Sequence, residues 1–400
     1  MTTQPMTPRA VWAMTGVLAL LSIFPPLATD MYLSAMSDIA VALDTSHSSI
    51  ELSLSLFFLG LGVGQFIIGP LLDGYGRKRP LMFGIALFCV TSAALLMTRD
   101  ATVFIGLRFL QAVGACTGML VGRAMVNDLW SGREAAKRLT VLVMLMTLGP
   151  IIAPSAGAVL LAAFGWQSIF VVMLGVGVLA FVLAQIILPE TLPQEARVQQ
   201  PMRRALPMMK SLLVRPEFTF PALTAALVQS SMFAFITGSA GVFKTGFGVS
   251  NLQYGLLFAL IAGALALSGP LNARLLDRFD TREIVNVALP VFAGFAALLV
   301  AASTLDILWL YVVPLWGTMA FVGLLTANLM AITMGAAKHA GGVGSALLGA
   351  MQFGIAFLSS SAVALGQSGD PMNMARGILV PALIALALWH FVGRRRVAFA

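Results

Sequence analysis

The chain has 400 residues, of which 59% are apolar and only 10% are charged, and its net charge is +8. Soluble domains are roughly 45–50% apolar and about 25% charged, so this composition excludes an ordinary water-soluble fold and indicates a membrane protein. The basic residues are dispersed over separate short segments, and we therefore expect no nucleic-acid surface.

Apolar runs long enough to cross a hydrocarbon core of about 30 Å recur along the whole chain. A lone strand in lipid would leave its backbone polar groups unsatisfied, so these runs are predicted to be helices. We predict twelve spanning helices, and hence an all-α membrane protein. The runs are Trp12 to Met36, Ser49 to Leu72, Leu81 to Thr98, Ala101 to Gly122, Leu139 to Ala163, Trp166 to Leu188, Phe218 to Phe243, Asn251 to Leu275, Ile284 to Leu305, Ile307 to Gly335, Gly342 to Gly366 and Met372 to Val392.

The placement of lysine and arginine predicts the orientation. With the N-terminus inside, 20 basic residues fall in inner segments, 3 in outer segments, and Arg108 remains within a span, which accounts for all 24. Loops rich in these residues stay on the cytoplasmic side. Both termini are therefore predicted to be cytoplasmic, and the outer basic residues are Arg99, Lys244 and Arg376.

Two similar segments indicate an internal duplication. The run ending in Gly69-Pro70 continues into a short charged loop, and Gly269-Pro270 opens a degraded copy of it 200 residues later. A duplication inside a membrane protein is typical of transporters built from two similar bundles. We expect bundles at residues 1–188 and 218–400, joined by a proline-rich cytoplasmic linker at 189–217 that includes a short amphipathic helix.

Asp30 and Arg108 are the two charges that no loop assignment removes from the predicted spans. Counted at about 1.5 Å per residue, Arg108 lies about 10 Å and Asp30 about 9 Å below the outer boundary. Ionisable residues inside a membrane usually pair or line a path for ions or substrate. They are either a structural ion pair or a coupling site at which Asp30 exchanges a proton under the influence of Arg108, and we favour the second. Pro25-Pro26, one turn before Asp30, predicts a bend.

Other chemistry finds little support in the chain. Cys89 and Cys116 lie in predicted spans without metal-type spacing, so neither a disulfide nor a zinc site is expected. The sequence has no Gly-x-x-x-x-Gly-Lys-Ser/Thr loop for nucleotide phosphates. We therefore expect no enzyme, no metal and no cofactor beyond the proton as coupling ion.

The chain resembles the major facilitator superfamily. The string from Gly69 to Arg79 is similar to that superfamily's signature loop, and Arg108-Phe109-Leu110-Gln111 is similar to its proton-coupling motif. Gly149-Pro150, Pro154 and Gly157 resemble its antiporter motif, although Ala153 replaces the glycine of the second Gly-Pro. Ala28-Thr29-Asp30-Met31-Tyr32-Leu33, Gly165-Trp166-Gln167-Ser168 and Pro189-Glu190-Thr191-Leu192-Pro193 point to its Bcr/CflA subgroup of drug/proton antiporters.

The resemblance implies two pseudo-symmetric six-helix bundles around a central cavity that opens alternately to the two sides of the membrane. It implies a conformational latch in the signature loop, formed by Asp73 with Gly69, Gly76 and Arg77. It also places the cavity between the first, fourth, seventh and tenth spans. Polar and aromatic residues on these spans are the substrate-binding candidates, namely Tyr32, Gln111, Gln229, Phe233, Phe235, Trp316 and Asn328.

The leading hypothesis is a monomeric, proton-coupled exporter of small amphipathic compounds, drugs included, in the bacterial inner membrane. The alternative is a proton-coupled importer of a nucleoside or similar metabolite, which the residues do not separate from the exporter. A membrane sensor without net flux is the remaining reading. The duplicated helical architecture with charges inside the membrane argues for transport over sensing.

Overall fold

The computed structural model describes residues 8–337, 341–367 and 369–393, and within these ranges every regular element is helical. The elements of the first half are α1 (Pro8–Ser22), α2 (Phe24–Leu33), α3 (Met36–Ala42), α4 (His47–Tyr75), α5 (Lys78–Met97), α6 (Ala101–Leu129), α7 (Gly132–Phe164) and α8 (Gln167–Ile187). Those that follow are η1 (Gln194–Ala196), α9 (Pro201–Val214), α10 (Pro216–Ala240), η2 (Gly241–Gly246), α11 (Asn251–Leu276), α12 (Thr281–Ala302), α13 (Leu308–Ala336), α14 (Gly341–Ala364), α15 (Pro371–Ala387) and η3 (Leu388–Gly393).

Most of the predicted spans are present as long apolar helices. Among the described residues, 10 helices are long and apolar enough to cross a membrane, and the bent pair α1–α2 brings the number to 11. The remaining predicted run, residues 139–163, falls on α7, and several of its side chains lie outside the described residues. The prediction of a multi-span helical membrane protein is therefore confirmed.

The first predicted span is broken, as its prolines indicate. α1 and α2 meet at Ile23 with a bend of 42°. Pro25 and Pro26 lie in the first turn of α2, where the missing backbone donor of proline costs nothing. The break thus falls just before the prolines and gives the segment with Asp30 an axis of its own.

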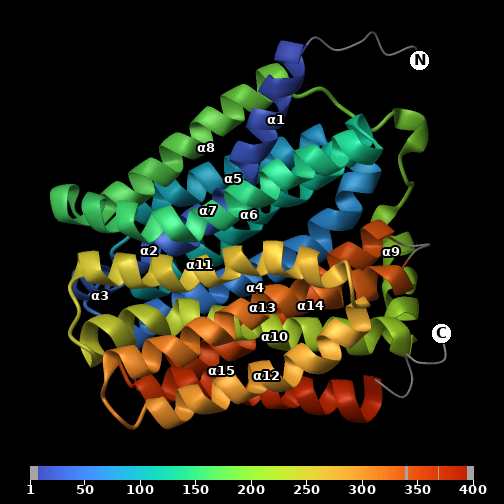
Figure 1. Cartoon of the computed structure of the whole chain (residues 1–400). Helices are drawn as coiled ribbons and strands as arrows, with labels where there is room; N and C mark the ends of the chain where they lie inside the picture. The colour runs from blue at the N-terminus through green and yellow to red at the C-terminus, as the bar shows by residue number, and fades with distance from the viewer. Residues whose placement is uncertain (1–7, 338–340, 368, 394–400) are drawn as a thin grey trace.

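Figure 1 shows α1, α5, α6, α7 and α8 in the upper part of the molecule and α10 to α15 in the lower part. Of the first-half helices, α4 makes the most extensive contact with the lower group, and it does so with α14. A side chain at Gly69 would clash there, because its Cβ would lie 2.8 Å from the Cβ of Ala346. Ser360 joins the seam by hydrogen bonds of 2.6 Å to Ser55 of α4 and Thr237 of α10.

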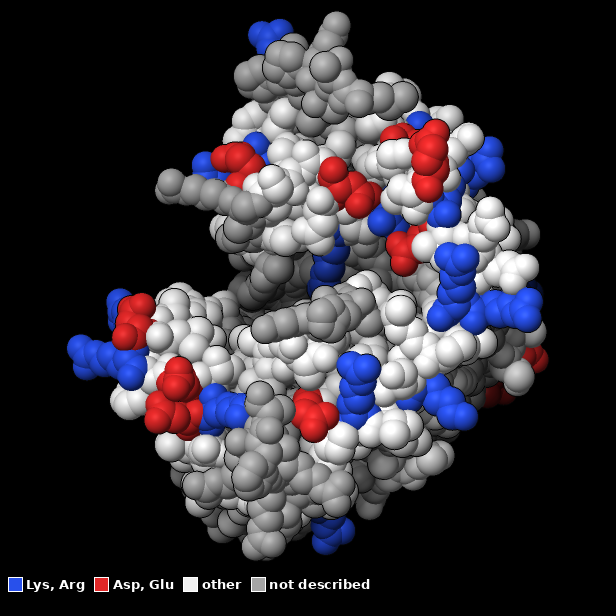
Figure 2. All heavy atoms as spheres, turned by 90° about the vertical axis from the view of Figure 1, so that its right-hand side faces the viewer, with Lys and Arg blue, Asp and Glu red and all other residues white. Residues whose placement is uncertain are grey.

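The molecule is hollowed on the face that forms the right-hand side of Figure 1. Figure 2 shows this face, with a cleft between the upper and lower parts and many basic and acidic side chains around it. At the opposite ends of the helices the two groups touch. The Lys244 ammonium donates to the Ser34 carbonyl at 3.3 Å, and a Cβ at Gly255 of α11 would lie 2.8 Å from Ser155 Oγ of α7.

The proline-rich segment after α8 contains the predicted amphipathic helix, α9, which begins at Pro201 and tolerates Pro207 in its interior. Its residues Ala205, Met209 and Leu212 are buried. Of the basic residues used for the topology prediction, Lys338, Arg394, Arg395 and Arg396 and the side chain of Arg133 lie outside the described residues.

Candidate functional site

Arg108 lies at the centre of a polar cluster inside the first half of the chain. Its side chain is completely buried. Nη1 donates to Gln111 Oε1 at 2.5 Å, one turn further along α6, and Nη2 donates to the Ala28 carbonyl of α2 at 2.9 Å. The guanidinium also lies 4.3 Å from the ring centre of Tyr32 and 4.4 Å from that of Phe57. Cation–π contacts of this kind are strongest where water is excluded.

Tyr32 and Gln111 extend the cluster to neighbouring helices. The Tyr32 hydroxyl lies 2.6 Å from Ser53 Oγ of α4, and Gln111 Nε2 donates to Ser92 Oγ of α5 at 2.8 Å. Both side chains are fully buried. These two predicted substrate-binding residues are therefore brought together with Arg108, and in this conformation their polar atoms bind protein groups.

Asp30 points away from this cluster. Residues two apart on a helix are separated by about 200°, so Asp30 and Tyr32 face nearly opposite sides of α2. Asp30 is 1% exposed and accepts a hydrogen bond from Thr29 Oγ1 at 3.1 Å. Its helix, α2, packs against α7 of the first half and contacts α10 of the second half. Within the described residues Asp30 and Arg108 form no ion pair.

The two aromatic candidates on α10, Phe233 and Phe235, also pack against different helices. Phe233 packs between Phe58 of α4 and Phe353 of α14, with ring centres 4.5 Å and 5.4 Å away. It therefore lies at the seam where α4 meets α14. Phe235 instead stacks on Phe258 of α11 at 5.0 Å. Gln229 has a buried Oε1 for which the described residues supply no hydrogen-bond partner.

Trp316 and Asn328 lie apart from this seam. Trp316 lines an apolar groove of about 390 Å³ formed by α11, α12 and α13, together with Phe295 and Phe321. Asn328 is buried and donates to Asn272 Oδ1 of α11 at 2.6 Å. Both therefore make contacts among the helices of the second half, and the structure does not bring them next to Phe233.

The glycines of the predicted antiporter motif allow α7 to approach the first span. A Cβ at Gly149 would lie 2.7 Å from Cβ of Pro26, and one at Gly157 would lie 2.5 Å from the Met31 carbonyl. Ser34 Oγ donates to the Pro154 carbonyl at 2.8 Å. The side chain of Pro150 lies outside the described residues. α7 is thus packed along the segment that carries Asp30.

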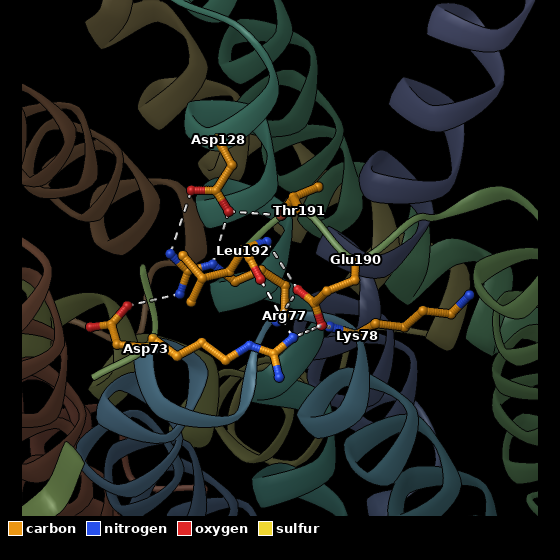
Figure 3. A network of polar contacts seen from close by, with 8 residues as sticks. Asp73, Arg77, Lys78, Asp128, Glu190, Thr191 and Leu192 are labelled. Atoms are coloured by element: carbon orange, nitrogen blue, oxygen red, sulfur yellow. Dashed lines mark hydrogen bonds and ion pairs between the residues drawn. The ribbon is translucent and has the colours of Figure 1, made fainter. Parts of the chain in front are cut away.

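The signature loop forms a network of charges at the ends of α4, α5 and α6 (Figure 3). Arg77 Nη1 binds Asp73 Oδ1 at 2.8 Å, and its Nε binds Asp128 Oδ2 at the end of α6 at 2.9 Å. Burial by itself lowers the pKa of the Arg77 guanidinium, but hydrogen bonds and attraction from Asp128 and Asp73 outweigh this and raise the pKa. Arg77 therefore stays charged and holds the ends of α4 and α6 together.

Glu190 closes the same network from the segment after α8. Its Oε1 accepts from the backbone N–H of Arg77 at 2.8 Å and its Oε2 from that of Lys78 at 3.2 Å, at the first turn of α5. Gly76 has φ +88°, a conformation that favours glycine, and a Cβ there would meet the Glu190 carboxylate. The backbone N–H of Val198 also donates to the Asp73 carbonyl at 2.9 Å.

The sequence analysis did not include three acidic residues among the candidate site residues. Asp128 and Glu190 belong to the loop network. Glu51 is 2% exposed in the first turns of α4, lies 3.4 Å from His47 Nε2, and lines a small cavity with Asp370 and Asn373. Its position near the start of a predicted span hid it, whereas the spacing of four from His47 is a signal that could have found the pair.

In the described part of the chain, no group of three or more His, Cys, Asp or Glu residues is arranged to hold a metal ion. The many membrane-spanning helices, the cleft between two groups of them and the buried charges define the class of membrane transport proteins.

The chain belongs to the Major Facilitator Superfamily, because the model of that family matches residues 18–360. It is 30% identical over 388 residues to an uncharacterized MFS-type transporter, YdgK, of Bacillus subtilis, covering 96% of each chain. It is 31% identical over 323 residues to a chloramphenicol resistance protein of Pseudomonas aeruginosa, covering 79% of this chain and 75% of that one.

A solved structure supports the fold. The crystal structure of a D-xylose-proton symporter superposes with a TM-score of 0.75 over 96% of this chain and 98% of that chain. The two sequences are 14% identical, so this likeness concerns the fold alone.

Proposed function

We propose that this protein is a proton-coupled exporter of small amphipathic compounds, including drugs, which works by alternating access. The observation that carries the proposal is the position of Asp30, a buried carboxylate on a broken span whose segment α2 packs against α7 of the first half and contacts α10 of the second. A group there can change its contacts when one half moves against the other, and proton binding can then be linked to that movement.

The proposed architecture has twelve spans in two six-helix bundles, at residues 1–188 and 218–400, with a cytoplasmic linker at 189–217. The protein would act as a monomer in the bacterial inner membrane with both termini in the cytoplasm. The distribution of basic residues supports this orientation. With it, the cleft of Figure 2 opens to the cytoplasm, and the contacts of Lys244 and Gly255 close the outer side.

Arg108 and the substrate-binding candidates take distinct parts in this proposal. Arg108, with Tyr32 and Gln111, fixes the α2 backbone next to Asp30 through the Ala28 carbonyl. Phe233 and Gln229 on α10 are the strongest candidates for contact with substrate, because one lies at the seam and the other has an unpartnered buried oxygen among the described residues. Export rather than import is supported by the resistance named for the Pseudomonas aeruginosa relative.

The signature loop would act as a latch. Asp73, Arg77 and Gly76 belong to one charged network, and a Cβ at Gly342, in the first turn of α14, would lie 3.9 Å from Asp73 Oδ2. Acidic groups are stabilised near a helix N-terminus by its partial positive charge. Because α4 belongs to the first half of the chain and α14 to the second, the contact joins the two halves. It therefore favours the conformation in which these helix ends lie next to each other.

Transport by reconstituted protein tests the coupling. Asp30→Asn keeps the volume of the side chain but removes proton exchange, so transport of chloramphenicol driven by a pH gradient should fall to the level of empty vesicles. Asp44→Asn is the matched control, since Asp44 is exposed in a turn with φ +48°, a conformation that asparagine tolerates. It should transport normally.

The direction of flux in the same assay separates the two candidate functions. Substrate movement opposite to the proton gradient supports the exporter, and movement with the gradient supports the importer, for which nucleosides are the panel to add. Gradient-driven transport by Asp30→Asn at the level of the unmodified protein would remove Asp30 from the coupling role.

A further inference from the structure

The linker helix α9 lies across the inner ends of the spanning helices rather than free in solution. It packs against α4, α10 and α14, on the right-hand side of the molecule in Figure 1, which is the face with the cleft. Pro201 at its start fits against Gly74 of the signature loop, where a Cβ would lie 2.9 Å from Cβ of the proline. At its other end Thr219 Oγ1 donates to the Leu213 carbonyl at 2.8 Å. α9 is therefore held against the ends of the spanning helices.

The exposed side of α9 combines basic and apolar side chains. Ala205, Met209 and Leu212 fill the buried face, while Leu206 is 47% and Leu213 44% exposed on its flank. The helix contains no acidic residue. Four exposed basic residues project from it and its end, namely Arg203, Arg204, Lys210 and Arg215.

These basic residues have no carboxylate partner in the part of the chain that the structure describes. The six ion pairs formed there involve other residues. Arg203 donates only to the amide oxygen of Gln200 at 3.2 Å. Guanidinium and ammonium groups bind phosphate oxygens by short charge-assisted hydrogen bonds, so this surface offers a set of unused phosphate donors.

We propose that α9 binds the headgroups of anionic phospholipids in the inner leaflet. The charge is complementary to such lipids, and exposed leucines beside the basic residues match the boundary between headgroups and acyl chains. A soluble acidic partner would satisfy the charges but leave Leu206 and Leu213 in water. Pro201 contacts the signature loop, and Leu213 contacts the start of α10. A lipid bound to α9 would therefore stabilise the linker between these two elements.

Lipid enrichment around α9 tests the proposal. Cys89 and Cys116 are replaced by alanine, and exposed Ser211 is changed to cysteine and labelled with a fluorophore. The full chain is reconstituted in phosphatidylcholine with a minor fraction of brominated phosphatidylglycerol or, in a parallel sample, brominated phosphatidylcholine. Brominated phosphatidylglycerol should quench the fluorophore as if it were enriched about fivefold or more near α9, which is the preference that one basic residue near an anionic surface gives. Added salt should reduce this preference.

The charge-neutral variant Arg203→Gln/Arg204→Gln/Lys210→Gln should lose this preference. Arg278→Gln/Arg282→Gln, which neutralises one exposed residue in the turn after α11 and one in the first turn of α12, should keep it. Melting temperature and size-exclusion profile establish that both variants are folded. Equal quenching by the two lipids, measured with the charged residues of α9 intact, would overturn the proposal. The basic surface of α9 would then fit a soluble acidic partner instead. A preference that survives in the triple variant would also overturn it. Neither readout requires transport, so the result is independent of the proposed function.

Discussion

At Gly76 the backbone has φ +88° and ψ 177°, and a Cβ there would meet the Glu190 carboxylate. Such a conformation costs other residues about 1–3 kcal/mol, and the displaced carboxylate would no longer cap α5. Gly76→Ala should therefore lower the free energy of unfolding by at least that amount. The control is Gly106→Ala in α6, where a Cβ would meet nothing within 4 Å and alanine favours the helix. Thermal melting of the two variants in the same detergent measures the difference, and equal melting temperatures would contradict it.

Arg108 depends on the shape of its guanidinium as well as on its charge. Two N–H groups reach Gln111 and Ala28, while the planar group lies over the rings of Tyr32 and Phe57. Lysine keeps the charge but cannot make this arrangement. Arg108→Lys should cost about 1.5–3 kcal/mol, the value of a hydrogen bond to a charged group, and should reduce transport. Arg99→Lys at an exposed position is the control, and an equal effect of both changes on melting would refute the prediction.

The identity of these residues was easier to predict than their partners. A charge inside an apolar run is visible in the sequence, so Asp30 and Arg108 were found, and both are buried. Which way they point was not visible, since membrane helices are apolar on lipid-facing and buried sides alike. Phe233 and Phe235 illustrate this, because two neighbouring candidates face different helices.

At the scale of elements, the contact between α7 and α11 closes the end of the molecule opposite the cleft. Gly255→Leu should force these helices apart at Ser155 and shift the protein toward the conformation open on that side. Gly263→Leu in the same helix is the matched control, since a Cβ there would meet nothing within 4 Å. Spin-label distances across the outer ends of α7 and α11 measure the effect. If Gly255→Leu leaves the distance distribution as in Gly263→Leu, this contact does not control closure.

Element boundaries followed from local sequence where prolines and charges mark them. The break before Pro25 is an example, and the short amphipathic helix expected in the linker is present as α9. The capping of α5 did not follow, because Glu190 lies 113 residues from the backbone N–H of Arg77 that it binds. A cap supplied from so far along the chain depends on the packing of α5 against α8, which no local pattern contains.

At the scale of the whole molecule, the two copies of the signature segment are stabilised in different ways. α12 begins with its own capping box, in which Asp280 and Glu283 bind each other's backbone N–H groups. α5 is capped by Glu190 from the segment that leads into the linker. The similarity of the two segments was visible in the sequence, but this difference in capping was not. The cap of α5 therefore depends on the segment that leads into the linker, whereas α12 is capped by residues of its own first turn.

This asymmetry gives the latch proposal a matched pair of acids. Asp73→Asn weakens the ion pair with Arg77 and removes a charge facing the first turn of α14, so it should destabilise the conformation described here. Asp277→Asn, at the exposed acid of the second copy, should have no such effect. A loss of about 1 kcal/mol, within the range for charges at helix ends, would change the ratio of conformations about fivefold. Spin-pair distances across the inner ends of α4 and α14 measure that ratio, and transport should slow with it. Identical distance distributions for the two variants would reduce Asp73 to a packing residue, because a charge that does not distinguish two conformations cannot shift their equilibrium.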